Sequence, residues 1–257
     1  MPHVAMRCML IVLPCVTGMA AAQLNIITNG DFESGNTAFS SDYSYSSGGN
    51  CCEGQYTVRA NGSTFNGSFV NPPPSAPGSV LMMVVNGSTV PNQRIWYQAV
   101  PVIAGTTYAM RLRGCTAVAG GPAILQWQID GSLIGASFSL PTTTAAWIDV
   151  PVVWTAPPGT TSAVVAVRNL NTSLFPNDFY IDELSMIPEP QCDPIDFNAD
   201  GLFPDTQDIA DFLTVFAGGP CPTGPSCGDI DFNNDGLFPD TLDIEALLSV
   251  FAGGACL

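Results

Sequence analysis

Two different hydrophobic periods divide the chain near Pro188. Before this residue, short runs alternate between apolar and polar positions, as in strands that bury one face. In the run TTYAMRLRG, Tyr108, Met110 and Leu112 share one face and the arginines lie on the other. A later run ends at Asp130-Gly131, a strong signal for a tight hairpin. Many short strands separated by turns predict a mainly β fold, a sandwich or barrel.

After Pro188, apolar residues recur at i, i+3, i+4 and i+7, the spacing of one helix face. Each stripe is followed by AGG, which predicts the end of a helix. One such short helix cannot bury its stripe alone, so the two are expected to pack together in a small all-α unit. The stripes are Ile209, Phe212, Leu213 and Phe216, then Ile244, Leu247, Leu248 and Phe251.

The N-terminus has the features of a secretory signal peptide. An apolar run, Met9–Val16, precedes three alanines, Ala20–Ala22, that offer a cleavage site. The protein is therefore expected to be secreted, and to be extracellular or bound to a cell surface. The expected organisation is a signal peptide (1–22), a β-sandwich (23–187), a linker (188–191) and a repeat domain (192–257).

Charge and composition exclude several functions. The chain has 22 acidic and 6 basic residues, a net charge of −16, so nucleic acid is not an expected partner. No run after the signal peptide is long enough to span a membrane. The only histidine is His3, which leaves no Ser-His-Asp or Cys-His centre in the mature chain. The protein is expected to be non-catalytic.

An acidic motif occurs twice near the C-terminus. DFNADGLFPDTQDI (196–209) returns as DFNNDGLFPDTLDI (231–244), 35 residues later. Oxygen side chains at positions 1, 3 and 5, then a glycine, open a calcium loop of the EF-hand kind. The carboxylates repel one another unless a cation neutralises them. The expected ligands are Asp196, Asn198, Asp200, the Leu202 carbonyl, Asp205 and Asp208, then Asp231, Asn233, Asp235, the Leu237 carbonyl, Asp240 and Asp243.

The loops depart from the EF-hand pattern at position 12, where Gln207 and Leu242 stand and an aspartate follows one place later. An aspartate ending, a helix directly after it, and GG and cysteine boundaries resemble the GC-type dockerin repeats. The resemblance covers Cys192 to Cys256. It implies two calcium ions and attachment to a protein partner, which for dockerins is a cohesin domain.

Seven cysteines remain after the signal peptide, and in an exported protein they are expected to form disulfides. In the repeat domain we favour Cys192–Cys256 with Cys221–Cys227, because antiparallel helices bring the end of one beside the loop of the other. The pairing Cys192–Cys221 with Cys227–Cys256 remains open. A disulfide between Cys115 and one of the adjacent Cys51 and Cys52 is plausible, and the other cysteine is then left over.

Four segments of the β region occur in a familiar order: IITNGDFESG, IWYQAVPVIAGTTYAMRLRG, AAWIDVPVVWTAPPGTT and DFYIDELSM. Together they resemble the carbohydrate-binding modules built on a galactose-binding-like jelly roll. The resemblance implies two antiparallel sheets and sugar binding on a concave face or in end loops. It also implies a structural calcium site, for which Glu33 and Asp182 match the ligand positions.

Sugar-binding candidates follow from strand parity and from the preference of sugars for aromatic faces and planar polar groups. Gln126 and Gln128 face away from Trp127, which is expected in the core. If their strand neighbours the one with Arg111 and Arg113, all four share a surface. Trp96 and Tyr97 point to opposite faces, so only one of them can be exposed on a given side, and the sequence leaves open which.

The leading hypothesis is a secreted, non-catalytic protein. Its sandwich binds carbohydrate or another extracellular surface, and its dockerin-like tail attaches calcium-dependently to a cohesin-like or cell-surface protein. One alternative is a structural cell-surface or matrix protein without sugar binding. A glycoside hydrolase is less favoured, because no pair of carboxylates in the β region stands out.

Overall fold

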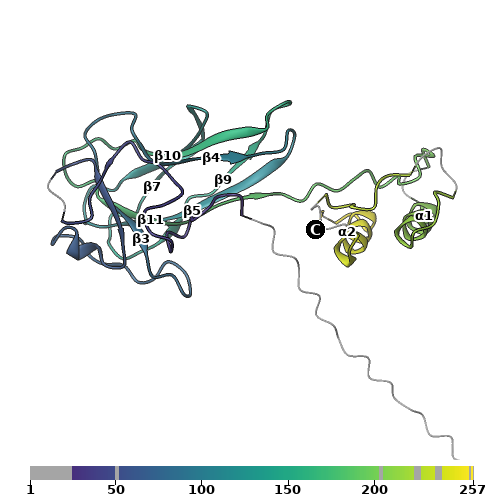
Figure 1. Ribbon diagram of the computed structural model, residues 1–257, viewed down its shortest axis with the longest axis horizontal. Coiled ribbons are helices and arrows are strands. Elements are labelled where there is room, and N and C mark those ends of the chain that lie inside the picture. Colours follow the sequence, from purple (N-terminus) through teal and green to yellow (C-terminus); the bar gives the residue numbers. More distant parts are fainter. Residues whose placement is uncertain are drawn as a thin grey trace, which may run out of the picture.

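The computed structural model describes residues 25–49, 52–202, 205–222, 227–234, 239–254 and 256. An elongated β-sandwich is followed by a small helical unit beyond one of its ends (Figure 1). The last strand ends at Pro188, and an extended segment leads from it into the helical unit. The predicted signal peptide lies outside the described residues.

The larger sheet has seven strands in the order β1-β2-β3-β11-β5-β8, with β9 also paired to β5. Its pairs are antiparallel except β1 with β2. Its strands are β1 (Ser44–Tyr45), β2 (Gln55–Arg59), β3 (Met82–Asn86), β5 (Thr107–Thr116), β8 (Ile148–Asp149), β9 (Val152–Thr155) and β11 (Phe179–Pro188).

The smaller sheet has four antiparallel strands in the order β4-β10-β6-β7. The β6–β7 hairpin turns at Asp130 and Gly131, with φ of 47° and 86°. Positive φ at both central residues matches the twist of the strands, so the predicted hairpin is confirmed. The strands are β4 (Arg94–Pro101), β6 (Ile124–Ile129), β7 (Ser132–Ser139) and β10 (Ser162–Asn169).

Alternating side chains of both sheets fill the space between them. Trp96, Trp127, Met110 and Leu112 are among the fully buried side chains. Trp127 Nε1 donates a 2.9 Å hydrogen bond to the carbonyl of Val150, so this indole leaves no polar atom unpaired. Each large side chain of this kind contributes roughly 1.5–3 kcal/mol by burial.

A second hydrophobic cluster covers part of the outer face of the seven-stranded sheet. The segment after η1 (Gly62–Thr64) packs Phe65 and Phe69 against strand residues that include Tyr180 and Cys115. The Cys115 thiol is free and buried there, so the predicted pairing with Cys51 or Cys52 is wrong. Its side chain belongs to this buried cluster.

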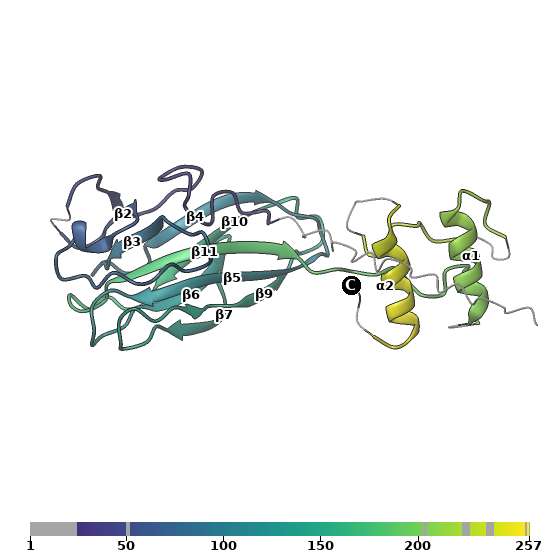
Figure 2. The ribbon, with the colours of Figure 1, turned by 90° about the horizontal axis from the view of Figure 1, so that it is seen from below.

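The helical unit contains the two predicted helices, α1 (Thr206–Phe216) and α2 (Thr241–Phe251), which lie side by side (Figure 2). Asp205 and Asp240 are the N-caps, and each forms a reciprocal capping box with the aspartate three residues later. Gly218 lies just past α1 with a φ of 85°, a conformation that favours glycine and ends the helix.

The core of the helical unit differs from the predicted stripes. Phe212 and Leu247 are buried, but Leu213 and Leu248 are 44% and 47% exposed. The expectation that both leucines are buried is wrong, because the buried cluster combines residues of the helices with loop residues such as Phe197, and neither leucine belongs to it. The favoured disulfides, Cys192–Cys256 and Cys221–Cys227, are both present.

Within the part of the chain that the structure describes, no helix is long and apolar enough to cross a membrane.

Candidate functional site

The outer face of the four-stranded sheet carries a row of residues in register. Ala166 in β10 pairs with Tyr97 on one side and with Gln128 on the other. Its neighbours Val165 and Val167 belong to the core between the sheets, so Ala166 faces outward. It is nevertheless only 1% exposed. A small residue between two larger ones makes a shallow trough, and we call this surface the Tyr97 face.

Tyr97 is covered on one side by a fixed cation. The guanidinium of Arg94 lies 3.6 Å from the centroid of the Tyr97 ring. Two hydrogen bonds of 2.8 and 3.0 Å to the carboxylate of Asp42 hold that guanidinium in place. The hydrogen bond with Arg94 keeps the pKa of Asp42 below its usual value. The result is a pre-organised stack of aromatic ring and planar cation.

A hollow of about 440 Å³ opens beside this stack. Its volume lies in the range typical of small-ligand sites. The segment that bounds it at the edge of β4 contains Ala38 in a left-handed conformation, with a φ of 67°. Such strain in a non-glycine residue is a pointer to function. The lining includes Phe39, Ser40, Arg94, Tyr97, Ala99 and Val164.

The predicted sugar-binding residues are divided between two surfaces. Gln126 and Gln128 share a sheet face with Tyr97, but Trp96 is fully buried in the core. The expectation that Arg111 and Arg113 share a surface with the glutamines is wrong. Their strand, β5, belongs to the seven-stranded sheet, whereas β6 belongs to the four-stranded one.

Sequence reasoning missed Arg94, Asp42 and Phe39. Asp42 and Arg94 are 52 positions apart and come from a loop and a strand, so no local spacing joins them. Tyr97 was a candidate, but only the structure shows that its ring is stacked.

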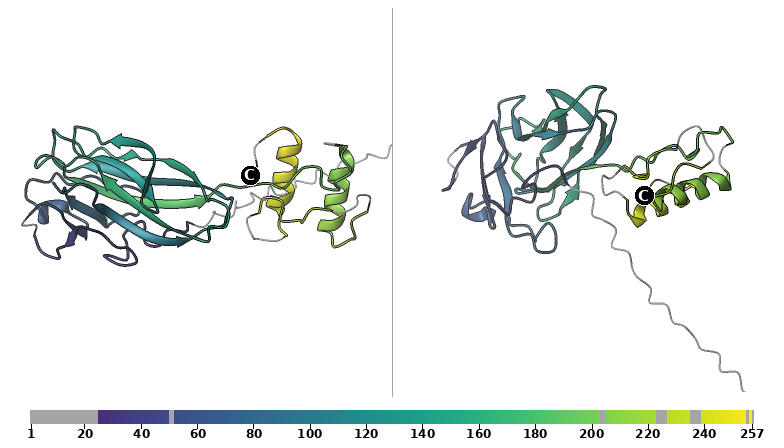
Figure 3. Two further views of the ribbon diagram at one scale, coloured as in Figure 1. Left: turned by 90° about the horizontal axis from the view of Figure 1, so that it is seen from above. Right: turned by 45° about the vertical axis from the view of Figure 1, so that its right-hand side comes forward.

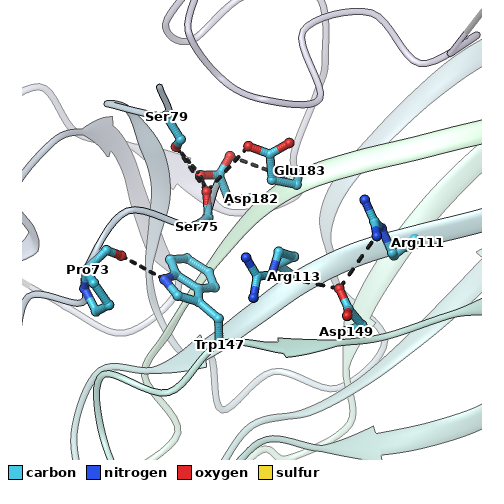
Figure 4. A network of polar contacts seen from close by, with 9 residues as sticks. All are labelled: Pro73, Ser75, Ser79, Arg111, Arg113, Trp147, Asp149, Asp182 and Glu183. Atoms are coloured by element: carbon cyan, nitrogen blue, oxygen red, sulfur yellow. Dashed lines mark hydrogen bonds and ion pairs between the residues drawn. The ribbon is translucent and has the colours of Figure 1, made fainter. Parts of the chain in front are cut away.

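On the opposite side of the sandwich, a buried carboxylate ties a loop to β11 (Figure 4). Asp182 Oδ2 accepts hydrogen bonds from the hydroxyls of Ser75 and Ser79, at 2.5 and 2.9 Å. Burial, above all, raises the pKa of Asp182 to about 7. Glu33 Oε1 accepts the N–H groups of Val80 and Leu81 from the same loop. Protein donors thus bind both carboxylates, and the calcium site expected here stays a prediction.

In the first tail loop, the predicted ligands hold the backbone in a wrapped shape. The carboxylate of Asp196 accepts the N–H groups of Asp200 and Gly201, at 3.1 and 3.0 Å. Asp208 links the helix start to the loop by accepting the N–H of Asn198 at 3.5 Å and that of Asp205 at 3.0 Å. Leu202, whose carbonyl is the expected ligand, is 65% exposed.

In the second loop, Asp243 repeats the contacts of Asp208, 35 residues later. Asp243 accepts the N–H of Asn233 at 3.5 Å and that of Asp240 at 3.0 Å. The pKa of Asp243 is raised, first by burial and further by the charges of Asp231 and Asp240. Asp235 and Leu237 lie outside the described residues. Among the described residues, no group of three or more His, Cys, Asp or Glu is arranged to hold a metal.

The calcium-loop motif in the sequence did not indicate Asp211, a fully buried carboxylate on α1. It accepts hydrogen bonds from the amides of Asn198 and Gln207, at 3.0 and 2.7 Å. Asn198, an expected calcium ligand, therefore also joins the loop to the helix.

No protein-family model and no curated protein matches the chain. Solved structures do match. The tandem CBM22-1–CBM22-2 domain of Paenibacillus barcinonensis Xyn10C is 14% identical, with a TM-score of 0.44, over 66% of this chain and 46% of that one. Family 16 carbohydrate-binding module-2 is 19% identical, with a TM-score of 0.37, over 63% and 99%. A cyclase from Fischerella sp. TAU is 14% identical, with a TM-score of 0.44, over 65% and 98%.

This chain spans 66%, 21% and 27% of the length of three further matching structures. The likeness to carbohydrate-binding modules is distant, and the matches include enzymes as well. Each of these TM-scores is below 0.5, so the likeness carries no argument about ligand or activity. The dockerin resemblance has no counterpart among the three structures described above and stays a prediction.

Proposed function

We propose that the chain is an exported, non-catalytic carbohydrate-binding protein whose tail is a calcium-dependent docking module. The observation that carries the carbohydrate assignment is the stack of Arg94 on Tyr97 beside the hollow of the Tyr97 face. A sugar ring packs its apolar side on flat groups and exchanges hydrogen bonds through its edge. The stack offers such a flat group, already held in one orientation.

Polar groups for the sugar edge lie along the same face. Gln128 donates its amide to the carbonyl of Gly131 at 2.8 Å, which fixes the side chain. Gln128 is 6% exposed on this face. Gln126 is fixed in the same way by the carbonyl of Gly135. Because planar side chains held by the protein lose little entropy on binding, they favour recognition of hydroxyl groups.

The tail loops have a donor set that suits calcium. All side-chain donors of the first loop are oxygens, which hard cations prefer. The N–H groups bound by Asp196 and Asp208 hold those carboxylates in place. In the second loop, burial raises the pKa of Asp243, and repulsion from the carboxylates of Asp231 and Asp240 adds to this rise. When bound, calcium supplies the positive charge that offsets this repulsion. The proposed ligands are the twelve residues named from the sequence.

The docking surface includes two exposed leucines at equivalent positions of the repeat. Leu213 and Leu248 are 35 residues apart and are half-exposed on α1 and α2. In this proposal the two leucines give a partner equivalent apolar contacts on the two helices. The partner is a cohesin-like or cell-surface protein.

Binding of the mature protein to a glycan array tests the carbohydrate assignment. Tyr97→Ala is expected to weaken binding about tenfold, the loss of one aromatic contact. Tyr45→Ala is the matched control, because Tyr45 is 45% exposed on β1 in the other sheet. If the wild type shows no saturable binding to any glycan, the carbohydrate assignment is wrong.

A further inference from the structure

The outer face of the seven-stranded sheet carries a second set of free polar groups beside an aromatic ring (Figure 4). Arg111 and Arg113 are two residues apart on β5 and point to the same side as Asp149 of the neighbouring β8. Trp147 lies next to Arg113 in this view. We call this surface the Arg111 face. It lies on the opposite side of the sandwich from the Tyr97 face.

The two arginines are poorly satisfied within the protein. Arg111 Nε and Arg113 Nε lie 4.0 and 3.8 Å from the same oxygen of Asp149, too far for hydrogen bonds. Arg113 Nε is buried without a partner among the described residues. Buried donors are rarely left unpaired unless a ligand or water completes them. The two guanidinium groups therefore have N–H donors that are free to bind a ligand.

The indole of Trp147 is fixed. Its Nε1 donates a 2.8 Å hydrogen bond to the carbonyl of Pro73, and its ring packs near that of Tyr180. The side chain remains partly exposed. A flat, immobile ring beside charged planar groups is the combination that binds a sugar ring.

A hollow of about 230 Å³ adjoins the face at Arg111. Asp31, Glu183 and Ser185 are in its lining. Glu183 has a φ of 54° and sits in a bulge, where β11 shifts register against β5 between Asp182 and Ser185. Bulges re-aim side chains and recur beside functional sites. Here the bulge places a carboxylate in the hollow's wall.

Charge decides which ligand suits this face. The positive groups are Arg111 and Arg113, and the negative groups are Asp149, Asp31 and Glu183. The buried Asp182 of β11 lies directly opposite Arg113 and adds a further carboxyl group. This balance gives no excess positive charge to hold an anionic sugar. Donors and acceptors lie close together instead, as hydroxyl groups need, since each hydroxyl both donates and accepts.

We propose that the Arg111 face is a second binding site, for a neutral sugar unit, and that the sandwich thereby bridges two glycan chains. The bridging rests on the proposed function, because it needs the Tyr97 face as the first site. Two sites on opposite faces cannot easily engage one short oligosaccharide, so they connect separate chains.

Native gel electrophoresis of the mature protein in soluble xylan, soluble β-glucan or polygalacturonate tests this inference. The acidic chain migrates to the anode, and a bound polysaccharide retards it. The turbidity of each mixture reports cross-linking. The variants are Arg111→Gln with Asp149→Asn, Tyr97→Ala, and all three changes together. Val153→Gln on the adjacent β9, 59% exposed, is the control. The side chains of Arg111 and Asp149 are 56% and 52% exposed, so the fold tolerates their change.

The wild type is expected to be retarded by a neutral polysaccharide and to turn the mixture turbid. Either single-face variant keeps part of the retardation and loses the turbidity, and the combined variant loses both. Turbidity equal to wild type in Arg111→Gln/Asp149→Asn overturns the second site. So does loss of all retardation in Tyr97→Ala alone, or retardation by polygalacturonate only.

Two further outcomes separate this inference from the proposed function. If Arg111→Gln/Asp149→Asn abolishes retardation while Tyr97→Ala keeps it, the Arg111 face binds sugar, but the Tyr97 site and the bridging are wrong. If no polysaccharide retards the wild type, both proposals fail.

Discussion

Asp178 Oδ1 accepts a 3.0 Å hydrogen bond from the backbone N–H of Gly87, joining the start of β11 to the end of β3. Asp178 is 4% exposed. Burial raises its pKa to about 6, and the bond from Gly87 only partly opposes this. The folded state therefore favours the protonated carboxyl.

The Asp178 carboxyl binds its proton more tightly in the folded state than in the unfolded state. The unfolded carboxyl loses its proton near pH 4, whereas the folded one keeps it to about pH 6. The contribution of Asp178 to the free energy of unfolding therefore falls as the pH rises from about 4 to about 6, and is level above that. Over this pH range, the contribution changes by at most roughly 3 kcal/mol.

Asp178→Asn keeps the acceptor for Gly87 and removes the titration. We expect urea unfolding of the sandwich from pH 4 to 7 to show that the free energy of unfolding of the variant rises relative to that of the wild type as the pH increases. A constant difference between the two proteins across this range would contradict the raised pKa.

The two tail disulfides close loops of different length, 64 and 6 residues of separation. Loop entropy predicts that Cys192→Ser/Cys256→Ser costs about 4 kcal/mol and Cys221→Ser/Cys227→Ser about 2 kcal/mol. Denaturant unfolding followed by helical circular dichroism measures both, because α1 and α2 lie in the tail. Equal losses would count against loop entropy as the main effect.

Leu247 and Leu248 are neighbours with opposite environments, buried and 47% exposed. Leu247→Ala is expected to destabilise the tail by about 2–5 kcal/mol, since it leaves a cavity. Leu248→Ala is its matched control and should change stability by no more than about 0.5 kcal/mol. If the two substitutions reduced the free energy of unfolding equally, Leu248 would be buried, as the sequence pattern predicted, and its exposed position would be wrong.

Calcium is expected to raise the thermal midpoint of the tail and leave that of the sandwich nearly unchanged. At a free concentration 100 times the dissociation constant, one bound ion stabilises by about 2.7 kcal/mol. Differential scanning calorimetry with calcium, with magnesium and with chelator measures the shift. Asp196→Asn/Asp231→Asn should weaken it, and in the first loop the substitution keeps one of the two oxygens that accept the N–H groups of Asp200 and Gly201. An identical tail transition in calcium and in chelator would refute the docking module.

Much of the fold could be predicted from local pattern. Alternation in the run containing Tyr108, Met110 and Leu112 correctly separated the buried face of β5 from its arginines. Asp130-Gly131 located a hairpin, because only a few residues tolerate its backbone conformation. The 35-residue repeat predicted two equivalent helices, and α1 and α2 begin 35 residues apart.

The site could be predicted only in part, because strand order is not local. Arg111 and Gln126 are close in sequence, yet β5 and β6 belong to different sheets and their polar side chains face opposite ways. The sequence did not indicate whether Trp96 or Tyr97 is the exposed aromatic residue, and the structure buries Trp96 in the core. The pairing of Asp42 with Arg94 depends on a loop laid along the edge of β4. Figure 3 gives two further views of the sandwich, in which segments of different colour, and so from different parts of the sequence, form the two sheets.

The sequence by itself determined the periods, the turns, the repeated acidic loops and the capping of both helices, since each depends on residues a few positions apart. Tertiary structure alone decided which strands are neighbours, and with them the two outer faces, the buried Cys115 and the exposed Leu213 and Leu248. Those features depend on contacts between distant segments. Their energy comes from burial in a shared core, which no short stretch of sequence contains.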